Sequence, residues 1–284
     1  MKVLGLVSSP RRLGNSELAV REILRCLPDE WEKRMIRLSD MNLIACKACY
    51  SCLAREDKSC ILKDDMDFIL RHMLRADKIV IAAPCYILGA HIGVQRLIDR
   101  LMPITENSLR FADKQCALVI SYGLPGWEGL AREEMLKIPH IFGMEFAGAV
   151  TLEATLPGDS IRGRNLRRLQ SLAEVLAERR PAETQESEEG VLLCPYCRSR
   201  LLTIKPDRTW RCVLCDVNGL VAVGEEGLAL EKNPLCENRF SAERRIAHER
   251  RLQEAKQQFI ERRAEIKLLQ EDYADGDWLR PPGT

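Results

Sequence analysis

Residues 2–27 read KVLGLVSSPRRLGNSELAVREILRCL and predict a strand, a turn-rich loop and a helix, in that order. The apolar run 2–8 ends in serine and proline, which is typical of a short buried strand. From Glu17 to Leu27 the apolar residues recur at helical spacing, and Pro28 ends the pattern. A buried strand followed by an amphipathic helix is the repeating unit of a parallel sheet that helices cover on both faces.

The same alternation continues through the first part of the chain. Further strands are expected at about 32–38, 78–83, 116–121 and 146–152, and helices at 64–74, 92–102, 126–142 and 159–178. Five such repeats in about 180 residues predict an α/β fold, a flavodoxin-like, doubly wound five-stranded parallel sheet. Ligands of such sheets lie at the carboxyl ends of the strands.

The rest of the chain has a different composition. We expect one domain over 1–180, a polar, acidic linker over 181–190, a small metal-bound ribbon over 191–236, and a charged helix with a tail over 237–284. The helix, from Ser241 to about Asp272, carries Leu252, Phe259 and Ile266 at seven-residue spacing, a stripe expected to pack on the body or on a second subunit. Its arginines alternate with glutamates, which is typical of a solvated face, so nucleic-acid binding is not expected.

Charge and hydropathy exclude other classes. The 43 basic and 42 acidic residues give a net charge of +1, which argues against a global nucleic-acid or membrane field. No apolar stretch reaches the roughly 20 residues of a membrane helix, and the N-terminus does not resemble a signal peptide. A cytoplasmic location is therefore expected.

Eight of the twelve cysteines fall into two tight groups. The first has three cysteines at three-residue steps and a fourth after seven more residues: Cys46, Cys49, Cys52 and Cys60. Three evenly spaced thiolates can wrap one face of a cuboidal cluster, so this spacing favours iron–sulfur over zinc. A zinc site and a loop of free thiols remain the alternatives.

The second group consists of two Cys-x-x-Cys pairs separated by fourteen residues: Cys194, Cys197, Cys212 and Cys215. This gap is close to that of zinc ribbons, in which two knuckles on a small hairpin share one tetrahedral ion. We expect a structural zinc ion, because such a segment has too little core to fold without metal. A rubredoxin-like iron site is the alternative.

The loop after the first strand predicts an anion site. It places backbone N–H groups at a helix N-terminus, where they attract a phosphate. Ser9, Arg11, Asn15 and Ser16 add side-chain donors. The alternative is that Asn15 or Ser16 only caps the helix.

Three segments resemble the NADPH-dependent FMN reductase family of flavodoxin-like proteins: SSPRRLGNSE at 8–17, APCYILGAHIGVQRLIDR at 83–100 and ISYGLPGWEG at 120–129. The resemblance covers residues 1–178 and implies that the first loop holds the phosphate of FMN. It implies two further contact regions: the ribityl chain and isoalloxazine would lie along Pro84, Cys85, Tyr86, Ile87, Leu88 and Gly89, and the other side of the ring along Ser121, Tyr122 and Gly123. The chain departs from the family at Cys85, usually an aliphatic residue, and at Gln95, often a lysine.

The first cysteine group and the following ILKDDM at 61–66 resemble the iron–sulfur flavoproteins within this family. This implies a [4Fe–4S] cluster beside FMN, and an oligomer with FMN near a subunit interface. The cysteine loop leaves the carboxyl edge of the sheet, where the flavin is also expected. No side chain is assigned as catalytic, because electron transfer needs no acid or base.

The leading hypothesis is an FMN-dependent electron-transfer oxidoreductase that couples the flavin to a one-electron partner such as ferredoxin. One alternative is an NAD(P)H-dependent FMN or quinone reductase without a cluster. The other is a zinc-ribbon adaptor for protein or nucleic acid on an inert flavodoxin-like scaffold.

Overall fold

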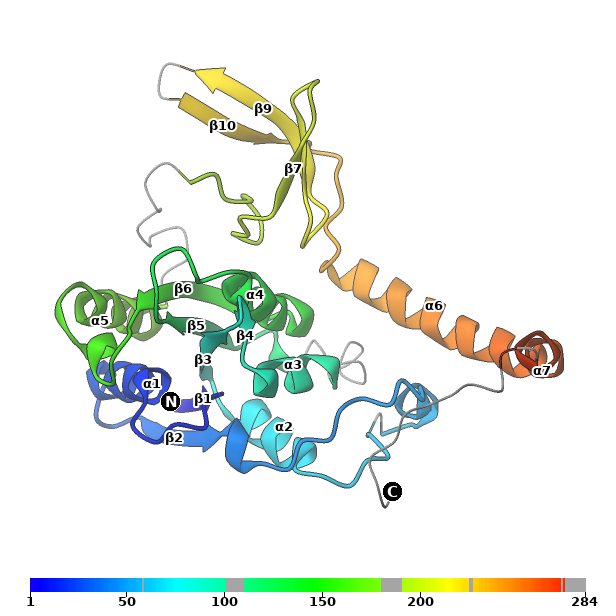
Figure 1. Ribbon diagram of the computed structural model, residues 1–284, viewed down its shortest axis with the longest axis horizontal. Coiled ribbons are helices and arrows are strands. Elements are labelled where there is room, and N and C mark those ends of the chain that lie inside the picture. Colours follow the sequence, from blue (N-terminus) through cyan, green and yellow to red (C-terminus); the bar gives the residue numbers. More distant parts are fainter. Residues whose placement is uncertain (58, 101–109, 180–190, 225–226, 272, 274–284) are drawn as a thin grey trace.

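The computed structural model describes residues 1–57, 59–100, 110–179, 191–224, 227–271 and 273 (Figure 1). Its N-terminal part is a parallel sheet in the order β2-β1-β3-β5-β6. The strands are β1 Lys2–Val7, β2 Glu32–Arg37, β3 Lys78–Tyr86, β5 Gln115–Tyr122 and β6 Glu145–Glu153. A two-residue strand, β4 Gly89–Ala90, pairs antiparallel with the end of β3. The flavodoxin-like strand order is confirmed.

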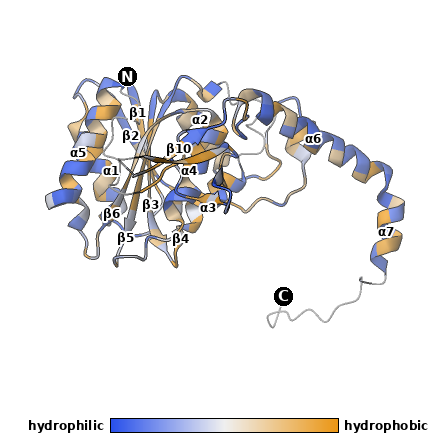
Figure 2. Cartoon of the chain, turned by 90° about the horizontal axis from the view of Figure 1, so that it is seen from above, coloured by the Kyte–Doolittle hydropathy of each residue, from blue (hydrophilic) through white to orange (hydrophobic). Residues whose placement is uncertain are grey.

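Helices cover both faces of the sheet (Figures 1 and 2). On one face lie α1 Asn15–Cys26 and α5 Gly163–Glu178. On the other lie α2 Met66–Arg75, α3 Ile92–Asp99 and α4 Ala131–Phe142. Because the central strands β3 and β5 are buried on both faces, their sequences are continuous apolar runs rather than alternating ones.

Three helix boundaries differ from the expectation. The helix expected from 126 begins at Ala131, since Gly126 and Gly129 adopt positive φ angles of 76° and 51°, which a right-handed helix excludes. The helix expected at 92–102 ends at Asp99, and residues 101 and 102 lie outside the described residues. The helix expected from 159 is a short 3-10 turn, Asp159–Ile161, followed by α5.

The cysteine-rich C-terminal segment is a four-stranded antiparallel sheet, larger than the expected hairpin. Its order is β10-β9-β8-β7, with β7 Leu202–Ile204, β8 Thr209–Cys212, β9 Asn218–Gly224 and β10 Gly227–Lys232. Its small core contains the four cysteines of the second group together with Trp210, Val217 and Phe240. The expected linker, 181–190, lies outside the described residues.

The charged C-terminal helix is divided into α6 Ala242–Glu261 and α7 Arg263–Glu271, with a break at Arg262. The side chain of Ser241 caps α6 by accepting a hydrogen bond from the N–H of Arg244. Figure 1 shows α6 leaving the ribbon sheet and extending past the rest of the molecule.

The apolar stripe of this helix packs only in part. Leu252 lines a cavity against the body, whereas Phe259 is 52% exposed. Asp272 and the tail from residue 274 lie outside the described residues. None of the described helices is long and apolar enough to span a bilayer.

Candidate cofactor and metal sites

The loop between β1 and α1 is the candidate anion site. Gly14 is the N-cap of α1 and has no side chain to cap the helix, so no N-cap side chain competes with an anion for the first-turn N–H groups. Glu17 shapes this loop: its carboxylate accepts a hydrogen bond of 2.6 Å from the N–H of Leu13 and pairs with Arg37 and Arg21. Burial by itself would raise the pKa of Glu17, but these hydrogen bonds outweigh it and lower the pKa to about 2.

Arg37 anchors the same loop from the end of β2. Its guanidinium donates to the backbone carbonyls of Ser9 and Arg11, both at 3.1 Å, and Ser39 donates to the carbonyl of Ser9 at 2.9 Å. The sequence interpretation missed Glu17 and Arg37. A signal for Glu17 exists, since a glutamate in the third helical position often accepts hydrogen bonds from the preceding loop.

The side chain of Asn15 holds the loop after β6. Its amide donates to the carbonyls of Ala154 and Leu156, both at 2.9 Å, and its oxygen accepts from the N–H groups of Gly158 and Ser160. These four bonds use the full capacity of the amide. Asn15 therefore offers an anion its backbone N–H rather than its side chain.

Ser16 and Ser121, expected on opposite sides of one ligand, lie close together. Their hydroxyl oxygens are 3.1 Å apart and buried. Beside them, the carbonyl of Tyr122 accepts a hydrogen bond from Ala154, and that of Gly123 accepts one from the hydroxyl of Thr155. The loops after β1, β5 and β6 therefore form one connected edge of the sheet.

The segment Pro84–Gly89 consists of the end of β3, the two-residue turn of Ile87 and Leu88, and the first residue of β4. Ile87 and Leu88 have positive φ angles of 47° and 64°, and Ile87 is 94% exposed. The carbonyl of Leu88 accepts a hydrogen bond of 2.7 Å from the N–H of Leu130. A strained backbone of this kind is held by its surroundings and is frequent at ligand sites.

Cys85 fastens this turn to the loop after β5. Its thiol donates to the carbonyls of Trp127 and Glu128 at 3.3 and 3.2 Å. Burial raises the pKa of the Cys85 thiol, so it stays protonated near neutral pH. An aliphatic side chain at this position would leave both carbonyls without this donor.

Large apolar side chains surround this edge. The exposed ones from these loops are Leu13, Tyr86, Ile87, Leu88, Leu124, Trp127, Leu130 and Leu156. An apolar rim around convergent polar groups is typical of a site that binds a flat apolar molecule or another protein surface.

His91 links this edge to α3. Its Nδ1 accepts hydrogen bonds from the N–H of Gly93 at 3.2 Å and from the hydroxyl of Ser8 at 2.9 Å. Burial lowers the pKa of His91. A Cβ atom on Gly93 would lie 2.6 Å from the Ser8 hydroxyl, so this close approach requires glycine.

The first cysteine group lies in the loop between β2 and α2. Cys46, Cys49, Cys52 and Cys60 line one small cavity, with Cys52 and Cys60 more buried than the other two. The N–H of Ala48 donates to the sulfur of Cys46 at 3.4 Å. Hydrogen bonding to Ser51 lowers the pKa of Cys49, whereas burial raises that of Cys52.

This donor set fits an iron–sulfur cluster. The four cysteines line one small cavity, and hydrogen-bond donors are directed at the sulfurs of Cys46 and Cys49, an arrangement that stabilises cluster thiolates. Positive φ angles at Ala48 and Tyr50 turn the backbone between the cysteines.

A buried ion pair fixes the base of the cysteine loop at the C-terminal end of α3. Asp64 and Arg100 approach to 2.5 Å with side chains only 1% and 2% exposed. Both also bond the backbone of Ile44. His91 caps the opposite end of α3, and eight helical residues span about 12 Å. The cysteine cavity is therefore lined by Asp99 and Arg100 at the C-terminal end of α3, whereas His91 at the N-terminal end of α3 bonds Ser8 of the anion loop.

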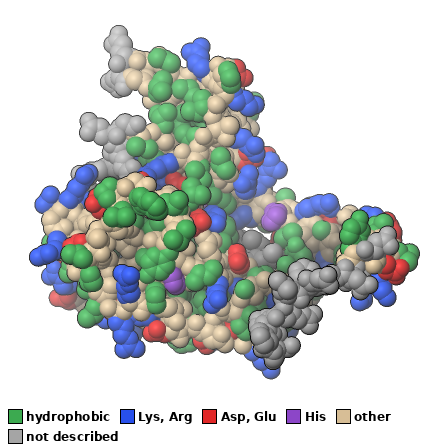
Figure 3. All heavy atoms as spheres, in the orientation of Figure 1, with side chains coloured by type: hydrophobic (Ala, Val, Ile, Leu, Met, Phe, Trp, Pro, Cys, Tyr) green, Lys and Arg blue, Asp and Glu red, His purple; other side chains and the backbone are tan. Residues whose placement is uncertain are grey.

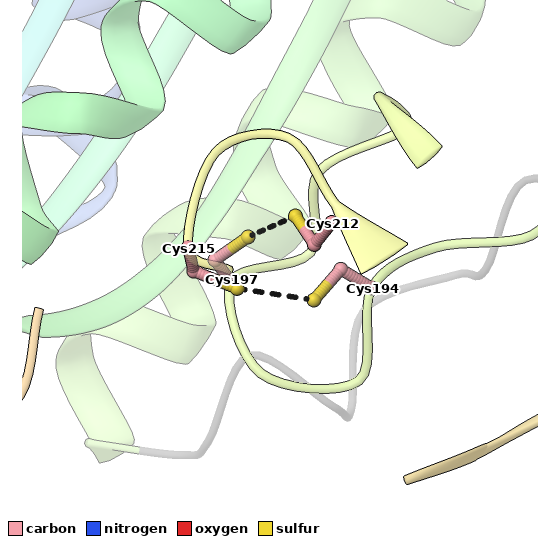
Figure 4. A group of neighbouring side chains, drawn as sticks. All are labelled: Cys194, Cys197, Cys212 and Cys215. Carbon is pink, nitrogen blue, oxygen red and sulfur yellow. Dashed lines mark hydrogen bonds between the residues drawn. The ribbon is translucent and has the colours of Figure 1, made fainter. Parts of the chain in front are cut away.

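The second cysteine group forms a compact, buried centre (Figure 4). The sulfurs of Cys194 and Cys215 are 3.5 Å apart, as are those of Cys197 and Cys212, and all four lie within 4.8 Å of one another. A metal–sulfur distance of about 2.3 Å gives tetrahedral edges of about 3.8 Å. The four thiols therefore fit one ion, either zinc or iron, and leave no room for a cluster.

The two knuckles of this centre have matching backbones. Arg198 and Asp216 both adopt positive φ angles, 61° and 72°, and their N–H groups bond the carbonyls of Cys194 and Cys212 at 2.9 and 3.0 Å. Hydrogen bonds from the other three thiols lower the pKa of Cys212, which prepares a thiolate ligand.

The ribbon sheet docks on α4 through His140. Its Nε2 lies 3.3 Å from the carbonyl oxygen of Cys197, and its ring stacks on Phe240 at 5.5 Å. Burial lowers the pKa of His140 to about 4, so the ring is neutral at pH 7. Glu133 of α4 accepts a further bond of 2.8 Å from the N–H of Arg200. No spacing pattern in the sequence signals this contact.

Helix α6 reaches the first cysteine group. The ammonium of Lys256 donates to the carbonyl of Tyr50 at 3.2 Å, between Cys49 and Cys52. In the described part of the chain, the C-terminal extension therefore contacts α4, through the ribbon and through Arg245 of α6, and the cysteine loop, through Lys256.

A flavodoxin-like sheet with an anion loop at its carboxyl edge is an architecture that can hold a flavin mononucleotide, and the family match places this chain among the flavin-dependent oxidoreductases. The sequence model of the NADPH-dependent FMN reductase family matches residues 1–155, and the chain belongs to this family. Its curated relatives are named iron–sulfur flavoproteins, which confirms the resemblance seen in the sequence.

Two of these relatives show the extent of the similarity. The protein from Methanocaldococcus jannaschii is 39% identical over 105 residues, which cover 37% of this chain and 53% of the relative, about half its length. One from Archaeoglobus fulgidus is 25% identical over 179 residues, or 63% of this chain and 80% of the relative. The solved structure of a flavone reductase covers 99% of this chain and 100% of its own, with a TM-score of 0.74 and 17% identity, and shows that the whole fold is shared.

Proposed function

We propose that this protein is an FMN-dependent electron-transfer oxidoreductase in which Cys46, Cys49, Cys52 and Cys60 hold a [4Fe–4S] cluster. The observation that carries the proposal is the four-cysteine cavity, with donors directed at its sulfurs, in a chain of the FMN reductase family. Relatives named iron–sulfur flavoproteins support it.

The FMN site would form at the carboxyl edge. Its phosphate would bind the first-turn N–H groups of α1, in the loop of Ser9 and Arg11 that Glu17 and Arg37 shape. The isoalloxazine would cover the apolar rim between Pro84–Gly89 and the loop of Ser121, Tyr122 and Gly123. FMN supplies acceptance of a hydride or of single electrons.

The cluster would exchange one electron at a time with a partner such as ferredoxin. Cys46 and Cys49 are exposed, so a partner can approach the loop closely. Since the loop lies one length of α3 from the anion loop of the same chain, we infer a homo-oligomer with the flavin near a subunit interface. The exposed apolar rim supports this arrangement.

The second cysteine group would hold a structural zinc ion, with iron as the alternative. Its four thiols are buried, and the surrounding core is too small to fold without such a crosslink. Clustered thiolates need a reducing compartment, so a cytoplasmic location is part of the proposal.

An NAD(P)H-dependent FMN or quinone reductase is the second candidate, because the matching family is described as NADPH-dependent. In that case a nicotinamide would deliver the hydride, and the first cysteine group would hold no cluster.

Purification without oxygen, followed by assays of iron, sulfide, zinc and flavin per chain, tests the proposal. The expected result is about four iron, four sulfide, one zinc and one FMN. The variant Cys49→Ser should lose iron and sulfide while keeping FMN, and the matched control Cys26→Ser, an exposed cysteine on α1, should keep all four. FMN with zinc alone would favour the plain reductase, and a chain without flavin would refute both candidates.

A further inference from the structure

A cavity of about 910 Å³ lies between α3, α4, the segment that follows β10, and α6. Its apolar wall comes from Ile98, Ile141, Phe240 and Leu252, and Cys46 lies at one end. This volume is in the range of small-molecule sites. The residues at the carboxyl edge that are proposed to bind FMN do not line it.

Arg245 brings a positive charge to this wall, and Glu243, two positions earlier in the chain, is the carboxylate whose charge acts on it. One guanidinium nitrogen donates to the carbonyl of His140 at 3.0 Å. Its Nε is buried without a hydrogen-bond partner, and no carboxylate of the described residues forms an ion pair with it. A guanidinium stays protonated in proteins, so this buried charge is costly unless an anion accepts it.

The other arginines that line the cavity form ion pairs or hydrogen bonds with other residues. Arg244 pairs with Glu237 at 2.8 Å, Arg251 lies 3.4 Å from Glu254, and Arg239 donates to two backbone carbonyls of the ribbon.

Two of the cavity's three carboxylates are engaged as well. Glu237 has Arg244, and Asp216 pairs with Arg211 outside the cavity. The third, Asp99, lines the end near Cys46. Lys and Arg side chains gather where the ribbon meets α6 (Figure 3), so positive charge predominates at the end where Arg245 lies.

We propose that this cavity binds a small organic anion with a ring-sized apolar body. A carboxylate, sulfonate or phosphate group would accept hydrogen bonds from the terminal guanidinium nitrogens of Arg245. The apolar body would pack between Phe240, Ile141 and Leu252. The groups proposed to hold the anion come from the C-terminal extension and α4, while α3 and the cysteine loop line the rest of the cavity.

The occupant would also lie against Cys46, and this part rests on the proposed function. If Cys46 ligates a cluster, the bound anion lies beside a cluster ligand. Binding should then change the electron paramagnetic resonance spectrum of the reduced cluster.

Isothermal titration of the complete protein with 2-naphthoate tests the site, with 2-naphthol as the neutral probe of the same ring size. We expect naphthoate to bind at least about tenfold more tightly than naphthol. Arg245→Met should weaken naphthoate binding about tenfold or more, whereas Arg262→Met, on the exposed surface after α6, should leave it unchanged. Leu252→Trp keeps Arg245 but narrows the apolar part of the cavity, and should weaken naphthoate binding about tenfold or more.

Zinc content and circular dichroism of each variant show that the ribbon remains folded. No naphthoate binding up to about 1 mM, equal binding of both probes, or binding within twofold of wild type in both Arg245→Met and Leu252→Trp would overturn the proposal. Binding without a spectral change would place the site away from Cys46. A preparation without iron would refute the cluster and leave the calorimetric test intact.

Discussion

Replacing Glu17 by glutamine removes one negative charge from the candidate phosphate loop and keeps the side-chain volume. The Glu17 carboxylate is only 4% exposed and Arg37 is 15% exposed, so the substitution leaves a nearly buried arginine with only its longer pair of 3.5 Å to the exposed Asp40. The N–H of Leu13 also loses a charged acceptor. We therefore expect lower stability and weaker FMN binding, because both bonds hold the loop in shape.

The magnitude follows from the pKa of Glu17. Its lowering from 4.5 to about 2 corresponds to about 3 kcal/mol of stability at pH 7. Breaking a buried ion pair by removing one partner costs a similar amount. A lowered carboxyl pKa stabilises the folded state fully above the unfolded pKa. The difference between wild type and Glu17→Gln should therefore be constant above about pH 5 and shrink as the pH falls toward 2.

Urea unfolding of the flavin-free protein, followed by circular dichroism between pH 7 and pH 3, measures this difference. Glu30→Gln, at an exposed position between α1 and β2, is the matched control and should leave the free energy of unfolding unchanged. FMN affinity is measured separately by quenching of flavin fluorescence. A loss below about 1 kcal/mol at pH 7, or a loss that does not shrink at low pH, would refute the assignment of Glu17 as an ionised anchor.

Three further substitutions test other parts of the structure. Arg100→Met breaks the buried pair with Asp64 and should cost about 3–5 kcal/mol and lower the iron content, as measured by denaturation and iron assay; full stability would contradict the anchoring role. Cys194→Ser should release the metal and make the ribbon sensitive to trypsin while FMN stays bound, and a protease-resistant, metal-free ribbon would argue against a structural ion. Gly129→Ala places a Cβ 2.3 Å from the carbonyl oxygen of Leu88, at a residue whose φ is +51°. The substitution should lower the free energy of unfolding by at least about 1 kcal/mol and weaken FMN binding. Unchanged binding would show that the turn is not part of the site.

Much of the fold was readable because it depends on local patterns. The continuous apolar runs at 78–83 and 116–121 became the central strands β3 and β5, and the strand order was the expected one. Helix starts were less accurate where glycine dihedral angles decided them, as at Gly126 and Gly129. The break at Arg262 was also missed, since the charge pattern continues across it.

The candidate sites were likewise predictable only where they depend on residues within one short segment. Spacing identified Cys194–Cys215 as a metal centre, because two knuckles depend only on short-range geometry. Spacing did not reveal that the side chain of Asn15 forms its hydrogen bonds with the loop after β6. It also did not reveal that Arg37 bonds the backbone of the anion loop. Those bonds join segments that are far apart in the sequence.

The sequence by itself determined the alternation of strands and helices, the anion loop and the two sets of four cysteines, because each depends on residues within one short segment. Only the tertiary structure decided where these parts meet. The pair of Asp64 and Arg100 carries the first cysteine group to the far end of α3, and His140 docks the ribbon on α4. The cavity around Arg245 exists only because α6 packs against α4 and the cysteine loop. No local pattern specifies a contact between residues so distant along the chain.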